Sequence, residues 1–287
     1  MIVRERLVLI GHPVSQSLSP VMHNAALKAK GFDLRYETLD VLPDNLDATL
    51  ASLARMKCGG NITIPHKKAA MHSMRVVSDV AQMVGAVNTF RGDGFGALDG
   101  DNTDVPGFNG AVQDLLGEIP SGIRVALLGT GGAAAAAATA MDEWSDVTVS
   151  VHARDLARAM SMRMRHSNVV RACSMRDPCL ADADLVVNAT TVGMGNDEIP
   201  VELEMLRTNA SVLDLVYGRN ETAFVRGARA AGHKTSDGLR MLLHQGAAAF
   251  RLWFGENPDS AVMWSAPVCS TRAPSYLRVL CNLPKFG

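Results

Sequence analysis

The chain has 287 residues, of which 47% are hydrophobic and 20% charged, a composition typical of a globular protein with one large or two ordinary domains. Its formal net charge of -1 provides no basic surface for nucleic acid or an anionic membrane. The apolar runs are too short to span a bilayer, and the N-terminal residues lack a signal-peptide pattern. These features predict a cytoplasmic protein without nucleic-acid or membrane partners. They do not distinguish a monomer from a homodimer, and both are retained as expectations.

The cysteine and histidine spacings indicate neither a disulfide framework nor a metal site. The five cysteines are odd in number, widely spread and free of any Cys-x-x-Cys pair. The eight histidines include no His-x-His or His-Glu-x-x-His arrangement. The sequence therefore predicts no bound metal and a reducing compartment.

The first hundred residues alternate short apolar runs with helical patterns. Strands are expected at 6–10, 34–39 and 61–64, with helices at 45–56 and from about His66. A further helix opens with Ser19 as its N-cap and Pro20 at its first position, and Gly31 ends it. Residues 87–90 and 95–98 are expected to pair as a hairpin closed by Gly92-Asp93-Gly94. This order predicts a mainly parallel sheet covered on both faces.

A helix at 104–116 leads into a second unit with a repeated strand–helix rhythm. Its expected strands are 124–128, 147–151, 169–172, 185–189 and 211–215, and its helices include an alanine-rich one from 133 and one at 156–165. This is a doubly wound, Rossmann-like nucleotide-binding pattern.

The predicted fold class is therefore α/β with two domains. A substrate domain comprises residues 1–103 and 238–287, because a helix at 238–254 is expected to return to it, and a nucleotide-binding domain comprises 104–237. The tail from Pro267 shows no periodicity, and no element is predicted there.

The turn Gly129-Thr130-Gly131-Gly132-Ala133 lies between a predicted strand and a predicted helix. Gly129 permits a tight turn, and Gly131 lets the backbone approach a pyrophosphate, which the helix N-terminus attracts. A close-packed turn without a ligand is the structural alternative. Arg154 and Asp155 follow the second strand, where an arginine favours a 2′-phosphate and an acid favours free ribose hydroxyls. These residues alone do not decide whether the cofactor is NADP or NAD. The simpler alternative is that Arg154 and Asp155 form an ordinary surface ion pair.

Polar residues gather beside turns in the first domain and around it. They supply hydroxyls, amides, one ammonium and one carboxylate, which suit a small, polyhydroxylated anion on which a proton moves. Their motifs, with those further on, are Ser17-Leu-Ser19-Pro20 with His23-Asn24, Asn61-x-Thr63-x-Pro65-x-Lys67, Gly85-Ala-Val-Asn88-Thr89, Asp101-Asn102-Thr103-Asp104, Gly129–Ala133, Asn188-Ala-Thr190 with Gly193-Met194, Asp214-Leu-Val-Tyr217, and Asp237-Gly238-x-x-Met241-Leu242-x-x-Gln245.

In this order, the motifs resemble those of the shikimate dehydrogenase family. The resemblance implies reversible, NADP-linked reduction of 3-dehydroshikimate to shikimate in aromatic amino-acid biosynthesis. It implies that Ser17 and Ser19 hold the substrate carboxylate, and that the ring hydroxyls and carboxylate contact Thr63, Asn88, Tyr217 and Gln245. The cofactor-binding residues that it implies are Gly129, Thr130, Gly131, Gly132, Ala133, Arg154, Asp155, Leu215 and Gly238. Each polar residue also has a structural alternative, such as helix capping for the serines.

Lys67 and Asp104 match the family's catalytic pair. Hydride reduction of a ketone creates an alkoxide that needs a proton, and the pKa of a lysine in a closed cleft falls toward neutrality by desolvation. A nearby carboxylate opposes that shift but orients the ammonium. Lys67 is therefore assigned the acid/base role and Asp104 the orienting role, against the alternative of a surface ion pair. Lys68 is expected to be solvated.

Three departures from the family pattern keep other functions open. Asp155 stands where the family commonly has threonine or serine, the segment after Tyr217 lacks the usual prolines, and the tail does not resemble the usual final helix. The alternatives are a quinate/shikimate dehydrogenase using NAD, a paralogue of the pathway enzyme, and a non-catalytic sensor of the same ligand. The presence of both Lys67 and Asp104 disfavours the sensor.

Overall fold

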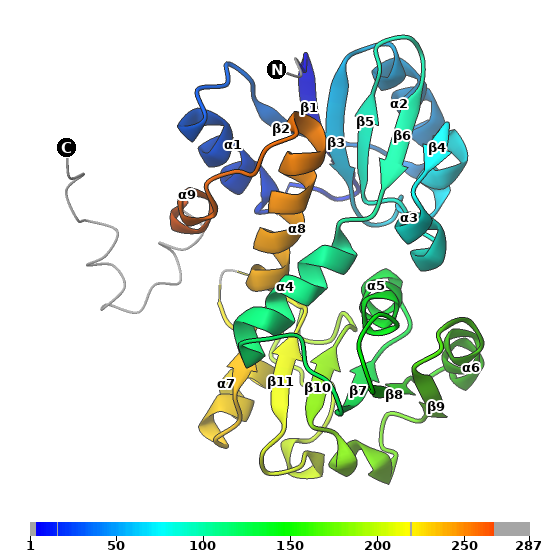
Figure 1. The fold of residues 1–287 in the computed structure, drawn as a ribbon, viewed down its shortest axis with the longest axis vertical. Helices are drawn as coiled ribbons and strands as arrows, with labels where there is room; N and C mark the ends of the chain where they lie inside the picture. The colour runs from blue at the N-terminus through cyan, green and yellow to red at the C-terminus, as the bar shows by residue number, and fades with distance from the viewer. Residues whose placement is uncertain (1–3, 16, 219, 267–287) are drawn as a thin grey trace, which may run out of the picture. The chain divides into compact units, whose positions relative to one another are not determined.

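The computed structural model describes residues 4–15, 17–218 and 220–266, so the tail from Pro267 lies outside the described residues (Figure 1). The chain divides into two compact units. The first contains Met1–Gln82, Ala86–Thr103 and Gly246–Gly287, and the second contains Met83–Gly85 and Asp104–Gln245. Within the described ranges, every helix is too short or too polar to cross a bilayer.

The first unit is built on a six-stranded sheet in the order β2-β1-β3-β5-β6-β4. The strands are β1 (Arg6–Gly11), β2 (Tyr36–Asp40), β3 (Cys58–Ile62), β4 (Val76–Val77), β5 (Thr89–Gly92) and β6 (Leu98–Asp101). The helices in this part of the chain are α1 (Ser19–Ala29), α2 (Leu46–Ala54) and α3 (Asp79–Val84), with 3-10 turns η1 (Pro43–Asn45) and η2 (Ala69–Ser73). Near the C-terminus follow α8 (Gly238–Phe254) and α9 (Ser260–Ser265).

This sheet is mainly parallel, as expected, and β5 is the antiparallel strand among those described. β1 pairs in parallel with β2 and β3, and β4 with β6, whereas β5 is antiparallel to both β3 and β6. The expected hairpin forms, but its second strand begins at Leu98, and Phe95 is 90% exposed in the turn. Gly92 lies within β5, so the turn is longer than the glycine pattern indicated.

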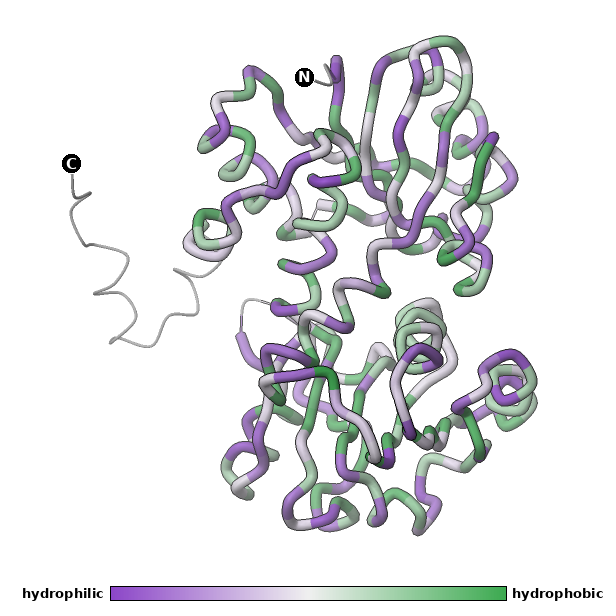
Figure 2. Tube along the Cα trace, viewed as in Figure 1, coloured by the Kyte–Doolittle hydropathy of each residue, from purple (hydrophilic) through white to green (hydrophobic). Residues whose placement is uncertain are grey.

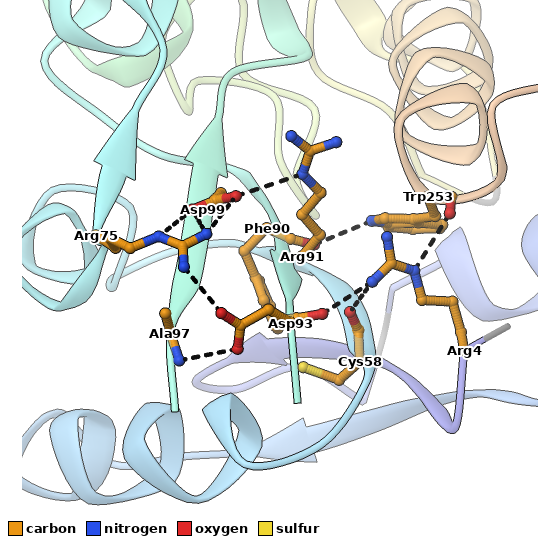
Figure 3. Close-up of polar contacts among 10 residues, drawn as sticks. Arg4, Cys58, Arg75, Phe90, Arg91, Asp93, Ala97, Asp99 and Trp253 are labelled. Atoms are coloured by element: carbon orange, nitrogen blue, oxygen red, sulfur yellow. Dashed lines mark hydrogen bonds and ion pairs between the residues drawn. The ribbon is translucent and has the colours of Figure 1, made fainter. Parts of the chain in front are cut away.

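The end of α8 is joined to the first unit's sheet by hydrogen bonds of Trp253 and Arg4 (Figure 3). Trp253 is fully buried and donates through Nε1 to the carbonyl of Phe90 at 3.1 Å. Arg4 donates to the carbonyl of Trp253 at 3.2 Å and to that of Cys58 at 3.1 Å. These bonds connect residues far apart in sequence and provide hydrogen-bond partners for backbone carbonyls. The C-terminal helical segment thus packs on the N-terminal sheet.

The second unit contains a parallel six-stranded sheet in the order β12-β11-β10-β7-β8-β9. Its strands are β7 (Arg124–Leu128), β8 (Thr148–His152), β9 (Val169–Cys173), β10 (Leu185–Asn188), β11 (Ser211–Asp214) and β12 (Thr235–Ser236). Its helices are α4 (Asp104–Leu116), α5 (Gly132–Met141), α6 (Leu156–Arg165) and α7 (Ala223–Ala230), with 3-10 turns η3 (Pro178–Asp182) and η4 (Leu203–Met205). This is the strand order of a doubly wound dinucleotide-binding fold, with its switch point between β7 and β10.

Local sequence explains the helices of the second unit. α5 is mostly alanine, its residues from Ala134 on are buried, and Figure 2 colours it pale green. Small side chains let this helix pack closely. Asp155 caps α6 by accepting hydrogen bonds from the backbone N–H groups of Ala157 and Arg158, and Thr222 caps α7 through Val225.

Three local expectations in the first unit differ from the structure. Ser19 is the first residue of α1 and makes no side-chain cap, since Leu18 occupies the N-cap position. The helix expected from about His66 is only the 3-10 turn η2, because the chain from Ile64 to Lys68 is a turn segment fixed by hydrogen bonds such as His66 Nε2 to the Val41 carbonyl. The pattern at 45–56 splits into η1 and the shorter α2.

Candidate functional site

The candidate polar residues of the first unit lie in segments that adjoin one edge of its sheet. β1 and β3 run in parallel, with Ile10 opposite Ile62, so both end at this edge. β5 begins there and β6 ends there, because Thr89 lies opposite both Asn61 and Asp101. Topology therefore brings together the segments that carry Ser17, Ser19, Thr63, Lys67 and Asn88.

The turns after β1 and β3 contact each other at Gly11. A Cβ atom at Gly11 would overlap the methyl group of Thr63, so only glycine allows this approach. The backbone N–H of Thr63 donates to the carbonyl of Ile10 at 2.8 Å, and that of His12 donates to the carbonyl of Ile64 at 3.0 Å. The two turns thus form one connected surface.

Ser17 and Ser19 lie side by side, with 3.3 Å between their hydroxyl oxygens. The backbone N–H of Ser19 also donates to the hydroxyl of Ser17 at 3.3 Å. Ser19 is 9% exposed and Ser17 is half-buried. Two adjacent hydroxyls can donate to the two oxygens of one carboxylate.

Asn88 is 2% exposed, and a set of neighbouring donors fixes its amide. Its Oδ1 accepts from the backbone N–H of Thr103 at 2.7 Å and from the hydroxyl of Thr89 at 2.9 Å. Asn61 in turn donates to the backbone carbonyl of Asn88 at 3.2 Å. With its oxygen engaged in this way, Asn88 presents amide hydrogens at its other end. The motif pattern contained Asn61, Thr89 and Thr103, but only the sheet pairing shows that they position Asn88.

Lys67 lies in the turn after β3 and is half-buried, whereas Lys68 is exposed, as expected. The carbonyl of Lys67 accepts from the backbone N–H of Val87 at 2.8 Å, which anchors the turn beside the start of β5. Asp104, 3% exposed, is the first residue of α4 in the second unit. The pairing of Lys67 with Asp104 stays a prediction.

The glycine turn of the second unit lies at the switch point of its sheet. Gly129 follows β7 with a φ of +109°, and a Cβ there would lie 3.0 Å from the carbonyl oxygen of Ala189, which follows β10. Glycine is therefore required by both conformation and space. In doubly wound sheets, ligands bind beyond the strand ends at this crevice.

Packing within the protein does not require glycine at positions 131 and 132. A Cβ at either residue would meet no protein atom within 4 Å, and Gly131 is exposed as the N-cap of α5. The start of this helix is therefore open around both glycines, with Thr130 and Ala133 on either side. This open cradle fits the pyrophosphate of a dinucleotide.

Arg154 and Asp155 lie at the end of β8, and both are exposed. Asp155 caps α6 and also pairs with Arg158 at 3.4 Å. Its carboxylate therefore has a structural role whichever cofactor binds. The guanidinium of Arg154 can reach solvent, where it could pair with a phosphate.

A buried network shapes the segment from Leu215 to Tyr217. Asp214 accepts from the amide of Asn188 at 2.8 Å, from the hydroxyl of Thr222 at 2.5 Å and from the backbone N–H of Val216 at 3.0 Å. Burial raises the pKa of Asp214, while these hydrogen bonds oppose the shift. A Cβ at Gly238 would overlap the carbonyl oxygen of Leu215, which brings these two residues together.

Tyr217 and Gln245 accompany Asp104 in the second unit. Tyr217 is half-buried, and its pKa is raised by burial and by the negative charge of Asp104. Gln245 lies on α8, where a Cβ at Gly107 of α4 would come within 2.8 Å of the Gln245 Cβ. Helices α4 and α8 thus cross closely beside Asp104.

Comparisons with known proteins agree with this geometry. Residues 9–90 match the model of the shikimate dehydrogenase substrate binding domain, and residues 238–266 match that of the shikimate 5′-dehydrogenase C-terminal domain. The NADP(+) shikimate dehydrogenase of Moorella thermoacetica is 41% identical over 90% of this chain and 90% of its own.

Two solved structures are also similar over most of their length. The Thermus thermophilus shikimate 5-dehydrogenase, in complex with NADP(H) and shikimate, is 38% identical with a TM-score of 0.85, covering 93% of this chain and 99% of that chain. Quinate dehydrogenase from Corynebacterium glutamicum, in complex with NAD, is 33% identical with a TM-score of 0.81. The match covers 90% of this chain and 96% of that chain. The chain belongs to the shikimate dehydrogenase family.

Proposed function

We propose that this protein is an NADP-linked shikimate dehydrogenase, an oxidoreductase that interconverts 3-dehydroshikimate and shikimate in aromatic amino-acid biosynthesis. One observation carries the proposal. The segments that contain Ser17, Ser19, Lys67 and Asn88 all meet at the same edge of the first unit's sheet. The relatives from Moorella thermoacetica and Thermus thermophilus are named as shikimate dehydrogenases, which supports the proposal.

Each polar group can bind a particular part of a hydroxylated cyclic acid. The paired hydroxyls of Ser17 and Ser19 bind its carboxylate. Asn88 donates to a ring hydroxyl from an amide whose oxygen is already engaged by Thr103. Thr63, Tyr217 and Gln245 contribute further contacts to the hydroxyls and the carboxylate, which together orient the ring.

Lys67 carries the proton of the reaction. When bound, the nicotinamide supplies or accepts the hydride. Lys67 then donates a proton to the oxygen that becomes the hydroxyl, and in the reverse direction it removes that proton. Asp104 orients the ammonium group and accepts a hydrogen bond from the same hydroxyl.

The second unit, which includes the predicted domain of residues 104–237, binds the cofactor. The first unit binds the substrate. Gly129, Thr130, Gly131, Gly132 and Ala133 hold the pyrophosphate at the start of α5. Arg154 and Asp155 lie beside the adenosine ribose, and Leu215 and Gly238 border the nicotinamide. The exposed Arg154 supports NADP, while Asp155 weakens discrimination against NAD.

We expect a cytoplasmic monomer or homodimer without nucleic-acid partners. The described cysteines are free thiols, which fits a reducing compartment. Size-exclusion chromatography with light scattering measures the oligomeric state.

A steady-state assay with shikimate and quinate, each with NADP and NAD, tests the function. We expect the largest kcat/KM with shikimate and NADP. A preference for quinate with NAD would favour the quinate dehydrogenase alternative, which the similarity to the Corynebacterium glutamicum enzyme makes concrete. Binding of shikimate without turnover in any combination would support a sensor instead.

A further inference from the structure

We propose that His152, Cys173 and Cys179 form a binding site for a thiophilic divalent metal ion such as Zn²⁺. The three residues come from the end of β8, the end of β9 and the turn η3. One ligand atom from each lies within 4.8 Å of the other two. Because three separate segments contribute, no sequence spacing could indicate this site.

The distances are close to the edges of a tetrahedral site. The two thiol sulfurs are 3.3 Å apart, and the sulfur of Cys179 is 3.8 Å from Nε2 of His152. Zinc lies about 2.3 Å from sulfur and about 2.0–2.1 Å from nitrogen, so tetrahedral edges are roughly 3.6–3.8 Å. Small side-chain movements therefore suffice to enclose an ion.

The ring of His152 is already oriented as a ligand. Its Nδ1 contacts the backbone carbonyl of Ser174 at 3.1 Å, and since a carbonyl only accepts, Nδ1 carries the proton. Nε2 therefore presents its lone pair toward the thiols. A backbone carbonyl on the other ring nitrogen is the usual outer partner of a metal-binding histidine.

Ser150 can release Nε2 without losing its own hydrogen bond. Its hydroxyl lies 3.0 Å from Nε2 of His152 and 3.3 Å from the carbonyl of Val125. When Nε2 binds a metal, the hydroxyl can donate to Val125 instead. No buried polar group of this set is then left unpaired.

Asp177 holds Cys179 in place beside the other two ligands. Its carboxylate accepts from the backbone N–H of Cys179 at 3.0 Å and hydrogen-bonds the Cys179 thiol. His152 and Cys173 are buried, whereas Cys179 is partly exposed and offers a route for the ion. Water supplies the fourth ligand, and the ion links the end of β8, the end of β9 and η3.

Cobalt titration of the full-length, reduced and chelator-treated protein tests the site. Co²⁺ bound to thiolates in a tetrahedral site gives intense sulfur-to-metal and d–d absorption, which zinc then abolishes. We expect saturation at one Co²⁺ per chain, and a zinc-dependent rise in Tm. Absence of the thiolate–cobalt absorption in the folded wild-type protein would overturn the proposal.

Variants locate the ion. Cys179→Ser and His152→Asn should each weaken Co²⁺ binding by more than about tenfold, since loss of an outer partner alone typically costs 10–100-fold. His233→Asn is the matched control, because His233 is also buried and its Nδ1 also contacts a backbone carbonyl, that of Ala210. A second control replaces Cys58, Cys269 and Cys281 with alanine. Absorption lost in a control but kept in Cys179→Ser would place the metal elsewhere.

The same preparation distinguishes a disulfide from a metal site. If Cys173 and Cys179 instead form a disulfide when the reductant is replaced by oxidised glutathione, each thiol loses one proton and one electron to that oxidant. Mass spectrometry detects the loss of two hydrogens. A disulfide that forms while the reduced protein binds no Co²⁺ would overturn the metal site.

Discussion

The side-chain oxygen of Asn88 accepts a hydrogen bond of 2.7 Å from the backbone N–H of Thr103. This contact joins the start of β5 to the end of β6, one residue before Asp104. An interior hydrogen bond thus sets both the orientation of a substrate-side amide and the path of the chain into α4.

Asn88→Ala should therefore reduce both stability and substrate affinity. It leaves the buried N–H of Thr103 unpaired, which costs about 1–3 kcal/mol of unfolding free energy. Urea denaturation measures this loss, and the KM for shikimate should rise at the same time. If KM rises without any change in unfolding free energy, the hydrogen bond to Thr103 does not support the fold.

Gly131→Ala should weaken binding of the cofactor without lowering the stability of the fold. No protein atom lies within 4 Å of the added Cβ, so the unfolding free energy should stay unchanged. The methyl group would project over the open N-terminus of α5, and we expect the KM for NADP to rise roughly tenfold or more, as a lost charged hydrogen bond would give.

Gly129→Ala is the matched contrast, because it forces an alanine into a φ of +109° against the Ala189 carbonyl. It should lower stability by about 1–3 kcal/mol. Equal stability of both variants would contradict the distinction between a structural and a ligand-facing glycine.

The acid stability of the protein should depend on His23. Burial lowers the pKa of His23 to about 3, its Nδ1 has no hydrogen-bond partner, and its ring stacks on Tyr36 with centroids 4.5 Å apart. The unfolded chain binds a proton near pH 6.5 and the folded chain does not, so stability is complete above that pH and falls as pH drops toward 3.

His23→Phe keeps an aromatic ring beside Tyr36 and removes the titration. Urea midpoints between about pH 7 and about pH 4.5 should fall less steeply for the variant than for the wild type, whose additional slope approaches about 1.4 kcal/mol per pH unit. Parallel pH profiles would show that His23 is not neutral in the folded protein.

Cofactor choice should depend on Arg154 and Asp155. Arg154→Ala should raise the KM for NADP roughly tenfold and that for NAD less, because only NADP carries the phosphate. Asp155→Thr should lower the KM for NADP and raise that for NAD, and threonine can still cap α6, so the fold is retained. Unchanged constants in both variants would place the adenosine ribose elsewhere.

Local patterns predicted the longer elements well. The helices α4, α6 and α8 begin and end where periodicity and composition placed them, and the doubly wound order of the second unit is confirmed. Ser19 was wrongly expected to cap α1, because Leu18 takes that position and the hydroxyls of Ser17 and Ser19 face each other. One residue of register decides such a cap, and local sequence does not fix it.

The fine structure of the candidate site depends on pairing between distant strands. The parallel ends of β1 and β3 make the grouping of Ser17 with Thr63 understandable from sequence. The antiparallel pairing of β5 with β3, which brings Asn88 to Asn61, does not follow from local pattern. The same holds for His152 with Cys173 and Cys179, whose proximity arises from β8–β9 pairing and the fold of η3.

The turnover of Lys67→Ala with shikimate and NADP tests the central claim most directly. Alanine keeps the backbone carbonyl that accepts from Val87, so the turn is retained, and the exposed neighbour provides the control variant Lys68→Ala. We predict that kcat falls about 10²–10⁴-fold in Lys67→Ala, with KM for shikimate changed little, and that Lys68→Ala resembles the wild type. A kcat for Lys67→Ala within a few-fold of the wild-type value would contradict the assignment of Lys67 as the group that carries the proton.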